Sequence, residues 1–248
     1  MAGVAIVSGG TSGIGKAVAT RLARDGLDVV AFGSDPAKVS ALAAETAAAG
    51  LPVQARTADT TDAAQVEALV HDVLERHGRV DVLCPAAGIK LPGGVVDTSP
   101  ADWDRVFGVN VRGAYLLTRA VLPAMVAQRA GAIVYIGSPS GHGGVDHAAY
   151  AASKGALHAL ATSVALDHVG DGVRVNTVVA GSTRTGMNQG RPEAVFERLG
   201  RANVAGRVNE PEDVAAVVAF LASPAAATVS GTRIDVGAFT GQGVLERG

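Results

Sequence analysis

Residues 4–15 read Val-Ala-Ile-Val-Ser-Gly-Gly-Thr-Ser-Gly-Ile-Gly, an apolar run followed directly by a glycine-rich turn. After the turn, Ile14, Val18 and Leu22 recur at the spacing of one face of a helix. The sequence therefore predicts a buried strand, a tight turn and a helix that ends before Gly26. Glycines in such a turn let backbone N–H groups approach a pyrophosphate at the helix N-terminus. If the glycines are considered by themselves, the alternative to a phosphate site is a tight turn that binds no ligand.

The same alternation of apolar runs and longer helical segments continues to the end of the chain. Seven runs rich in Val, Ile and Leu are expected to be strands: Val4–Val7, Asp28–Phe32, Val53–Arg56, Val80–Leu83, Ala132–Ile136, Val173–Val179 and Thr232–Val236. Five further segments are expected to be helices: residues 36–49, 62–77, Val111–Gln128, Tyr150–Val169 and Pro211–Ala222. Thr61 or Asp62 would cap one helix, and Pro211 suits a first turn. Near-continuous apolar strands are typical of a parallel sheet covered on both faces. We therefore expect an α/β fold with one doubly wound parallel sheet of about seven strands, forming a single domain over residues 1–248.

The composition limits the classes of partner. Hydrophobic residues make up 48% of the 248 residues and charged residues 18%, which suits a large core and argues against disorder. The formal charge is −2 and no long run of one sign occurs, so nucleic acid and anionic membrane are poor partners. Cys84 is the single cysteine, and the chain starts with no basic segment before its short apolar run. These features predict a cytoplasmic protein without a membrane span.

A second group of residues points to acid–base chemistry. In Tyr150-Ala151-Ala152-Ser153-Lys154, the tyrosine and lysine lie one helical turn apart on the same face. The fifth predicted strand ends in Gly137-Ser138-Pro139-Ser140-Gly141. A phenol has a pKa near ~10, and a nearby ammonium together with a cationic ring is expected to lower it. The Ser138 hydroxyl could then hydrogen-bond a carbonyl or alcohol. A Tyr-x3-Lys pair by itself is usually part of a solvated helix face. Here the pair follows the glycine turn in the same chain, and this combination argues against a chance occurrence.

With these motifs the chain resembles the short-chain dehydrogenase/reductase family over nearly its whole length. The resemblance implies a Rossmann-type fold and the catalytic set Asn110, Ser138, Tyr150 and Lys154. It implies cofactor contacts from Gly9, Thr11, Ser12, Gly13, Ile14, Gly15, Gly33, Ser34, Asp59, Ala87, Gly88, Tyr150, Lys154, Gly181, Thr183 and Thr185. By the same resemblance, Asp59 meets the adenine ring and Asn110 holds a proton-relay water. A threonine of the loop after the sixth strand would cap the nicotinamide carboxamide.

The chain departs from the family pattern at three positions. Ala86 replaces an asparagine that braces the central sheet, Ala180 replaces a proline before the nicotinamide loop, and Gly237 replaces an aspartate. None of these changes removes a catalytic group. The resemblance therefore implies an active enzyme that transfers hydride reversibly between a nicotinamide and a small ketone or secondary alcohol, with Tyr150 as the general acid and base.

The end of the second strand bears on the choice of cofactor. An acidic residue there would bind the ribose 2′-hydroxyl and repel a 2′-phosphate, but Gly33 occupies that position. Asp35 comes two places late and is expected to begin the following helix. Ser34 and Ser12 stand at the usual places of the family's phosphate-binding arginine. We therefore favour NADP(H) slightly over NAD(H).

Two loops and one lysine are the candidates for substrate contacts. The loop between Ser138 and Tyr150 contains His142, Asp146 and His147. The substrate-loop region around 184–208 contains Arg184, Asn188, Gln189 and Arg191. The lysine is Lys90, which follows Gly88. These side chains suit a polar or anionic substrate, and solvated loop residues are an equal alternative. The two histidines lack the neighbours of a metal site, so no metal is expected. Cys84 is expected to be a core residue rather than a nucleophile.

Other functions remain open at this point. The resemblance extends to 3-oxoacyl-(acyl carrier protein) reductases, although the acidic run Asp167-His168-Val169-Gly170-Asp171 argues against an acidic carrier. A nicotinamide-binding regulator without turnover is an alternative of another class, whereas an epimerase or dehydratase is disfavoured by chain length and glycine spacing. By resemblance we expect a homotetramer, with a dimer as the next choice.

Overall fold

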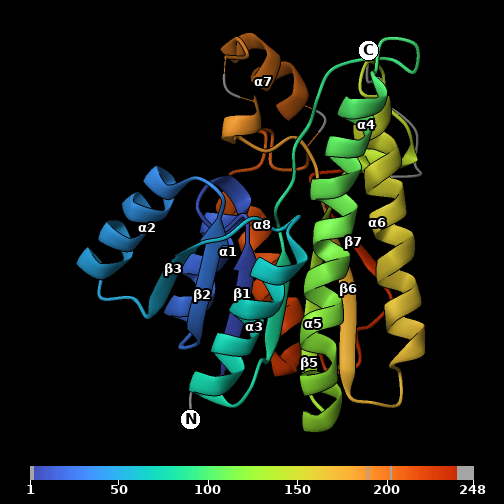
Figure 1. Ribbon diagram of the computed structural model, residues 1–248. Coiled ribbons are helices and arrows are strands. Elements are labelled where there is room, and N and C mark those ends of the chain that lie inside the picture. The colour runs from blue at the N-terminus through green and yellow to red at the C-terminus, as the bar shows by residue number, and fades with distance from the viewer. Residues whose placement is uncertain (1–2, 189, 202, 239–248) are drawn as a thin grey trace.

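The computed structural model describes residues 3–188, 190–201 and 203–238. It contains one parallel sheet of seven strands in the order β3-β2-β1-β4-β5-β6-β7 (Figure 1). The strands are β1 (Val4–Ser8), β2 (Asp28–Gly33), β3 (Val53–Thr57), β4 (Val82–Pro85), β5 (Gly131–Gly137), β6 (Val173–Ala180) and β7 (Arg233–Val236). The chain starts in the middle at β1, moves outward to β3 and then crosses to β4. This is the predicted doubly wound, Rossmann-type fold, and its strand order reverses between β1 and β4.

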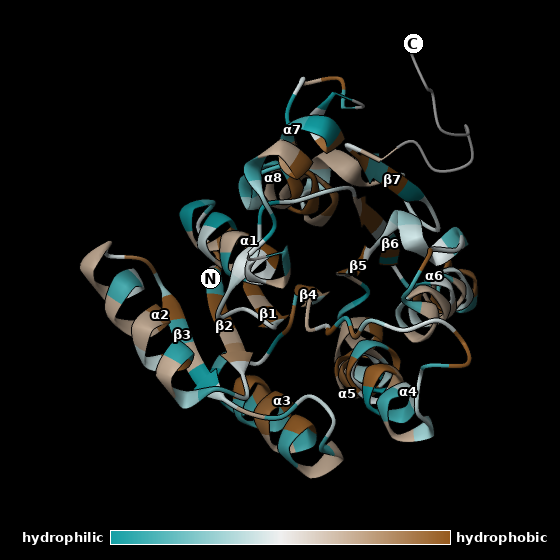
Figure 2. Cartoon of the chain, turned by 90° about the horizontal axis from the view of Figure 1, so that it is seen from above, coloured by the Kyte–Doolittle hydropathy of each residue, from teal (hydrophilic) through white to brown (hydrophobic). Residues whose placement is uncertain are grey.

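Helices cover both faces of the sheet. They are α1 (Gly13–Arg24), α2 (Pro36–Ala48), α3 (Ala63–His77), α4 (Pro100–Phe107), α5 (Gly113–Gln128), α6 (Ala148–Asp167), α7 (Glu193–Gly200) and α8 (Pro211–Ala222). A π-helical turn, η1 (Gly108–Arg112), precedes α5, and three short 3-10 helices are η2 (Pro139–His142), η3 (Gly186–Asn188) and η4 (Pro224–Ala226). Figure 2 shows α1, α2 and α8 on one side of the strands and α3, α5 and α6 on the other.

The apolar strands supply both halves of the core. Ile6 belongs to the cluster under α3, α5 and α6, whereas Val7 belongs to the cluster under α1 and α8. Successive side chains of a strand point to opposite faces, so both neighbours in β1 are buried. The near-continuous hydrophobicity of the predicted strands follows from this double coverage.

Several predicted boundaries need correction. The fourth strand is Val82–Pro85 and not Val80–Leu83, because β4 pairs with β1 from Val82 opposite Ala5 to Pro85 opposite Ser8. The helix predicted from Val111 begins in the π-helical turn, and the helix predicted from Tyr150 begins at Ala148.

No bounds are predicted for helices α4 and α7. Each has only eight residues, too few for a clear helical period, although Ser99 and Pro100 form a readable start for α4. Within α4, Trp103 stacks on Phe107 with the ring centroids 4.8 Å apart.

The predicted helix starts are confirmed at three positions. Asp62 caps α3 by accepting from the backbone N–H groups of Ala64 and Gln65, and Pro211 opens α8. Asp35 caps α2 in the same way, so its carboxylate is engaged with the helix and does not extend the second strand. In the part of the chain described, no helix is both long and apolar enough to span a bilayer.

Candidate active site

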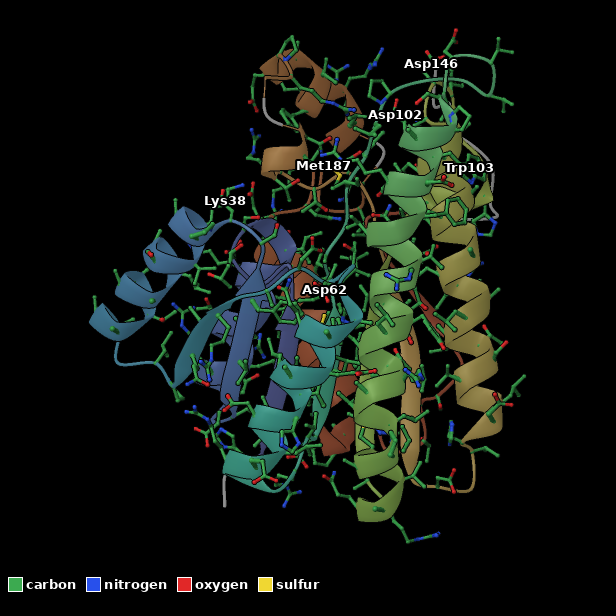
Figure 3. The ribbon with its side chains drawn as sticks, viewed as in Figure 1. Lys38, Asp62, Asp102, Trp103, Asp146 and Met187 are labelled. Atoms are coloured by element: carbon green, nitrogen blue, oxygen red, sulfur yellow. The ribbon has the colours of Figure 1, made fainter. Side chains whose placement is uncertain are left out.

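The predicted site residues lie at one edge of the sheet, where the carboxyl ends of the strands meet. These residues follow the strands in turn: Gly9 to Gly15 after β1, Ser34 after β2, Asp59 after β3, Ala87 and Gly88 after β4, Ser138 after β5, and Gly181 to Thr185 after β6. Tyr150 and Lys154 come from the first turns of α6, and Asn110 comes from η1. In Figure 3, Met187 marks the segment after β6 where it passes above the upper ends of the strands. Open α/β sheets bind ligands at this edge, near the switch in strand order.

The glycine turn leaves the start of α1 open. Ser12 occupies the N-cap position but makes no side-chain cap, in contrast to Asp35 and Asp62. The turn also closes tightly, because a Cβ atom on Gly15 would lie only 2.3 Å from the carbonyl oxygen of Gly9. A Cβ atom on Gly13 would lie 3.4 Å from the Thr185 methyl group, so the loop after β6 faces the turn. This arrangement suits a phosphate bound to the backbone N–H groups of the first helical turn.

The Tyr150 side chain is buried beside Ser138 and Lys154. The ammonium of Lys154 lies 5.7 Å from the centre of the Tyr150 ring and donates a hydrogen bond to the Ile136 carbonyl oxygen at 2.7 Å. The Ser138 hydroxyl accepts from the backbone N–H of Ser140 at 3.2 Å and also interacts with the Tyr150 phenol. Strand β5 thus delivers the serine, and α6 delivers the phenol and the ammonium to the same place.

Burial moves both ionisable groups toward their neutral forms. It raises the pKa of Tyr150, an effect that the hydrogen bond from Ser138 partly offsets. It lowers the pKa of Lys154 to about 8. The sequence predicts a lowered pKa for the phenol, so in the ligand-free chain the direction differs, because desolvation penalises the phenolate. At neutral pH Tyr150 therefore carries its proton and can act as a donor.

Asn110 ties the loop after β4 to α6. Its amide oxygen accepts from the Ile89 backbone N–H at 2.8 Å, and its amide nitrogen donates to the Ile89 carbonyl at 3.0 Å and to the Ser153 hydroxyl at 2.9 Å. Ser153, fully buried, in turn donates to the Tyr150 carbonyl oxygen at 2.7 Å. Sequence reasoning missed Ser153, although it lies inside the Tyr150–Lys154 motif. Asn110 and Ser153 together position the first turn of α6, which carries the Tyr150 phenol.

The space beside Lys154 fits a hydroxyl-bearing ligand. A Cβ atom on Gly88 would lie 3.8 Å from the Lys154 nitrogen and 3.4 Å from the amide oxygen of Asn110, so the missing side chain leaves room there. Among the described residues, only the Ile136 carbonyl accepts from this ammonium, which has three donors. A ribose diol at Lys154 and a pyrophosphate at the glycine turn are both compatible with these groups, so a nicotinamide dinucleotide fits the residues present.

The loops after β2 and β3 form the predicted adenosine end of the nucleotide site. A Cβ atom on Gly33 would lie 2.7 Å from the Thr11 hydroxyl, so β2 cannot end in an acidic side chain without moving that threonine. Ser34 is exposed. One oxygen of the exposed Asp59 carboxylate accepts from both the backbone N–H and the hydroxyl of Thr61, at 2.8 Å each, which orients the carboxylate.

Two of the departures from the family pattern have local explanations. The backbone of Gly237 is left-handed, with φ of 60°, and a Cβ atom there would collide with the side chains of Asn203 and Asn209. Near Ala86, the Ser8 hydroxyl accepts from the Ala87 backbone N–H at 3.3 Å and so links β1 to the loop after β4. We find no comparable replacement for the proline at Ala180.

The candidate substrate residues separate into two groups. Arg184 is held by Glu193 at 2.8 Å and stacks on Phe196, and Asn188 donates to the Thr183 carbonyl, so both organise the loop itself. His142 contacts Arg233. By contrast, Lys90 and His147 lie 5.4 and 5.9 Å from the centre of the Tyr150 ring. Gln189 lies outside the described residues.

Cys84 lies fully buried in the core beneath α1 and α8. Burial raises the pKa of its thiol to about 12, so it packs as a core residue and is no nucleophile at neutral pH.

The predicted argument against an acidic carrier is wrong. The run from Asp167 to Asp171 follows the C-terminus of α6, a helix of 20 residues that carries Tyr150 at its other end. Such a helix is roughly 30 Å long, so this run does not border the mouth of the site. His168 and Asp171 pair with each other at 2.7 Å.

Comparison with known proteins gives consistent matches over nearly the whole chain. A family model described as enoyl-(acyl carrier protein) reductase matches residues 9–238. A meso-2,3-butanediol dehydrogenase of Serratia marcescens is 39% identical, with 94% of this chain and 92% of the relative covered. A 3-oxoacyl-(acyl carrier protein) reductase of Thermotoga maritima is 35% identical, with coverage of 94% and 95%. The crystal structure of a variant actinorhodin polyketide ketoreductase with NADPH superposes with a TM-score of 0.89 at 33% identity, covering 95% of this chain and 95% of that one.

Proposed function

Since the chain belongs to the short-chain dehydrogenase/reductase family, and since its relatives include a butanediol dehydrogenase and a polyketide ketoreductase, we propose that it interconverts a small ketone and its secondary alcohol. A nicotinamide dinucleotide, when bound, supplies or accepts the hydride. The single observation that carries the proposal is the buried Tyr150 phenol, which lies beside the Ser138 hydroxyl and close to the Lys154 ammonium.

We assign the roles of the chain's own groups as follows. Tyr150 donates its proton to the carbonyl oxygen during reduction and takes it back during oxidation. Ser138 donates a hydrogen bond to the same oxygen and stabilises the charge that develops there. Lys154 binds the ribose hydroxyls and stabilises the phenolate that Tyr150 leaves behind. Asn110 fixes the helix turn beneath Tyr150 and is the candidate anchor for a relay water.

A panel assay tests this proposal. Small ketones and secondary alcohols are incubated with the protein and with NADPH, NADH or their oxidised forms, and the absorbance of the reduced nicotinamide is followed. Turnover of at least one ketone–alcohol pair is expected. Nucleotide binding without turnover of any compound would instead favour the non-catalytic regulator.

We favour NADP(H) over NAD(H), because no carboxylate at the end of β2 would repel a 2′-phosphate. Ser34 is exposed there, and Asp35 is occupied as the cap of α2.

Replacing Ser34 with aspartate is expected to weaken NADPH binding by roughly tenfold or more, about 1.4 kcal/mol, and to spare NADH binding. The added carboxylate would repel the 2′-phosphate but could accept from a 2′-hydroxyl. Fluorescence titration of both nucleotides measures the ratio, with Ser34→Asn as the uncharged control. Equal weakening of both nucleotides would contradict the assignment of this position.

A reductase of 3-oxoacyl thioesters is the second candidate. The family model and the Thermotoga maritima relative both carry the acyl carrier protein in their descriptions. The panel therefore includes a 3-oxoacyl thioester on acyl carrier protein and the same acyl group on a small thiol. A large preference for the carrier-bound form would favour this candidate over the small-molecule reaction.

We infer that the chain, a single domain, assembles into a homotetramer, with a dimer as the next choice. An apolar groove of about 420 Å³ runs between α5 and α6, lined by Tyr115, Thr118, Arg119, Leu122, Pro123, Val126, Leu160, Val164 and His168. Tyr115 is 47% exposed and Leu166 is 71% exposed on these helices. Such apolar surface favours contact with another copy. Sedimentation velocity is expected to show four copies at micromolar concentration; a monomer would contradict the assembly.

A further inference from the structure

Lys90 brings a second ammonium to the Tyr150 ring. Its nitrogen lies 5.4 Å from the ring centre, about as close as that of Lys154 at 5.7 Å. The His147 ring meets the same ring edge-on at 5.9 Å and shares a 3.1 Å hydrogen bond with the Ser140 hydroxyl. The loops after β4 and β5 thus place a lysine and a histidine around the phenol in addition to the predicted Lys154.

The environment of Lys90 differs from that of the other lysines. Lys16 pairs with Glu45, Lys38 pairs with Asp35, and Lys154 is bound to a backbone carbonyl. Within residues 3–188, 190–201 and 203–238, Lys90 has neither a hydrogen bond nor a carboxylate within 4.0 Å, although it is half-buried. A half-buried ammonium that has already lost part of its hydration and has no carboxylate beside it is suited to bind an anion.

Arg191, exposed in the loop after β6, adds a second positive charge that acts on Lys90 and His147. Burial lowers the pKa of Lys90, and the guanidinium of Arg191 lowers it further. Burial also lowers the pKa of His147; Lys90 and Arg191 act in the same direction, while Asp146 opposes them. Asp146 lies at the outer end of its loop in Figure 3, and no ion pair joins Arg191 to any described carboxylate. Lys90 therefore places a positive charge beside the phenol, and Arg191 adds to it from the loop after β6, in a chain whose net charge is −2.

We propose that Lys90, assisted by Arg191, binds an anionic group of the substrate, so that the preferred substrate is a ketone or secondary alcohol bearing a carboxylate or phosphate a few bonds from the reacting carbon. The inference rests on the proposed function, since the carbonyl oxygen is taken to lie at Tyr150 and Ser138. The anionic group and the reacting carbon must be only a few bonds apart, because the Lys90 nitrogen lies 5.4 Å from the centre of the Tyr150 ring, whose hydroxyl must reach the carbonyl oxygen. Lys90 is thus assigned to substrate specificity and Lys154 to nucleotide binding.

Matched pairs of anionic and neutral ketones provide the kinetic test. Acetoacetate is compared with methyl acetoacetate, and dihydroxyacetone phosphate with dihydroxyacetone, which separates a carboxylate from a phosphate. The wild-type kcat/KM is expected to favour one anion over its neutral partner by roughly tenfold or more, the size of one charge-assisted contact. Lys90→Met should lose about that factor on the anion, mainly through KM, and change the neutral partner less than about threefold.

Arg198→Met is the matched control, because Arg198 is exposed on α7 and belongs to the same segment as Arg191. It removes one positive charge and should leave the anion preference unchanged. No preference in the wild type, or an equal loss on both members of a pair in Lys90→Met, would overturn the inference.

A binding measurement separates this inference from the proposed function. The same anions are titrated calorimetrically into wild type and Lys90→Met, with and without the oxidised nucleotide, so that no ketone can react. Binding that weakens roughly tenfold or more in the variant supports the inference even if no compound is turned over, in which case the proposed function fails alone. If neutral ketones are turned over while no anion binds the wild type, the inference fails and the proposed function stands. Absence of both binding and turnover would overturn both.

Discussion

Replacing Tyr150 with phenylalanine is expected to lower kcat for ketone reduction by roughly a thousandfold, within the usual range for the loss of a general acid. The phenol is buried and protonated at neutral pH, because burial raises its pKa. Phenylalanine fills the same space and removes only the hydroxyl. The dissociation constant of the nucleotide should therefore change less than about threefold, as measured by fluorescence titration beside steady-state kinetics.

Tyr115→Phe serves as the control for this variant. Tyr115 is exposed on α5 and also loses only a hydroxyl, so its kcat should match that of the wild type. Turnover by Tyr150→Phe within about tenfold of the wild type would remove Tyr150 from the role of the acid and leave Ser138 or water as the donor.

Replacing Lys154 with methionine is expected to abolish nearly all activity and at the same time stabilise the fold. Burial lowers the pKa of this ammonium from 10.5 to about 8, which corresponds to a cost of roughly 3 kcal/mol for the charged form in the folded state. Methionine has a similar length and needs no charge. Its gain is reduced by about 1 kcal/mol, because the Ile136 carbonyl loses its partner. Urea unfolding at pH 7 should show a net gain of about 1–3 kcal/mol.

The pH dependence of that gain follows from the lowered pKa. Below pH 8 the lysine is protonated in both the folded and the unfolded chain, so the wild type bears the whole cost. Between pH 8 and 10.5 the unfolded chain holds the extra proton, and the wild-type stability rises relative to that of the variant. The difference in unfolding free energy should therefore shrink over this range. Lys38→Met, at the exposed lysine on α2 in Figure 3, should show little change at any pH, and a destabilised Lys154→Met would contradict the account.

The fold could be predicted because its signals are local and repeated. Most strands are short apolar runs ended by glycine or a polar residue, and the caps Asp35 and Asp62 stand at the helix starts. The boundary of β4 was missed because pairing with β1, a long-range contact, fixes it. The bounds of helices α4 and α7 were not predicted, because eight residues contain little more than two turns.

The residues of the candidate site could be predicted from the sequence, but their burial, pKa shifts and hydrogen bonds could not. The sequence correctly brings Ser138, Tyr150 and Lys154 to one place, since the carboxyl ends of parallel strands share one edge. It could not give the direction of the phenol pKa, which depends on how much of the side chain is buried. Nor could it show the link from Asn110 to Ser153, whose residues are 43 positions apart.

The position of Lys90 shows the same limit. The sequence places it after Gly88 and suggests an anionic substrate, but solvated loop residues fit the sequence equally well. Only the three-dimensional arrangement shows its nitrogen 5.4 Å from the Tyr150 ring, with no described carboxylate beside it. The interpretation of the run from Asp167 to Asp171 failed for a related reason: the run belongs to the same helix as Tyr150 but lies at its other end, away from the site.

Deuterium transfer provides the most direct examination of the reaction assigned to this site. NADPH and NADH labelled with deuterium at C4 on each face are incubated with the protein and the ketone that gives turnover, and the alcohol is analysed by mass spectrometry. One labelled face is predicted to deliver a single deuterium to the carbinol carbon in wild type, with almost no product from Tyr150→Phe. An alcohol formed without deuterium from either face, or formed equally well by Tyr150→Phe, would contradict the account.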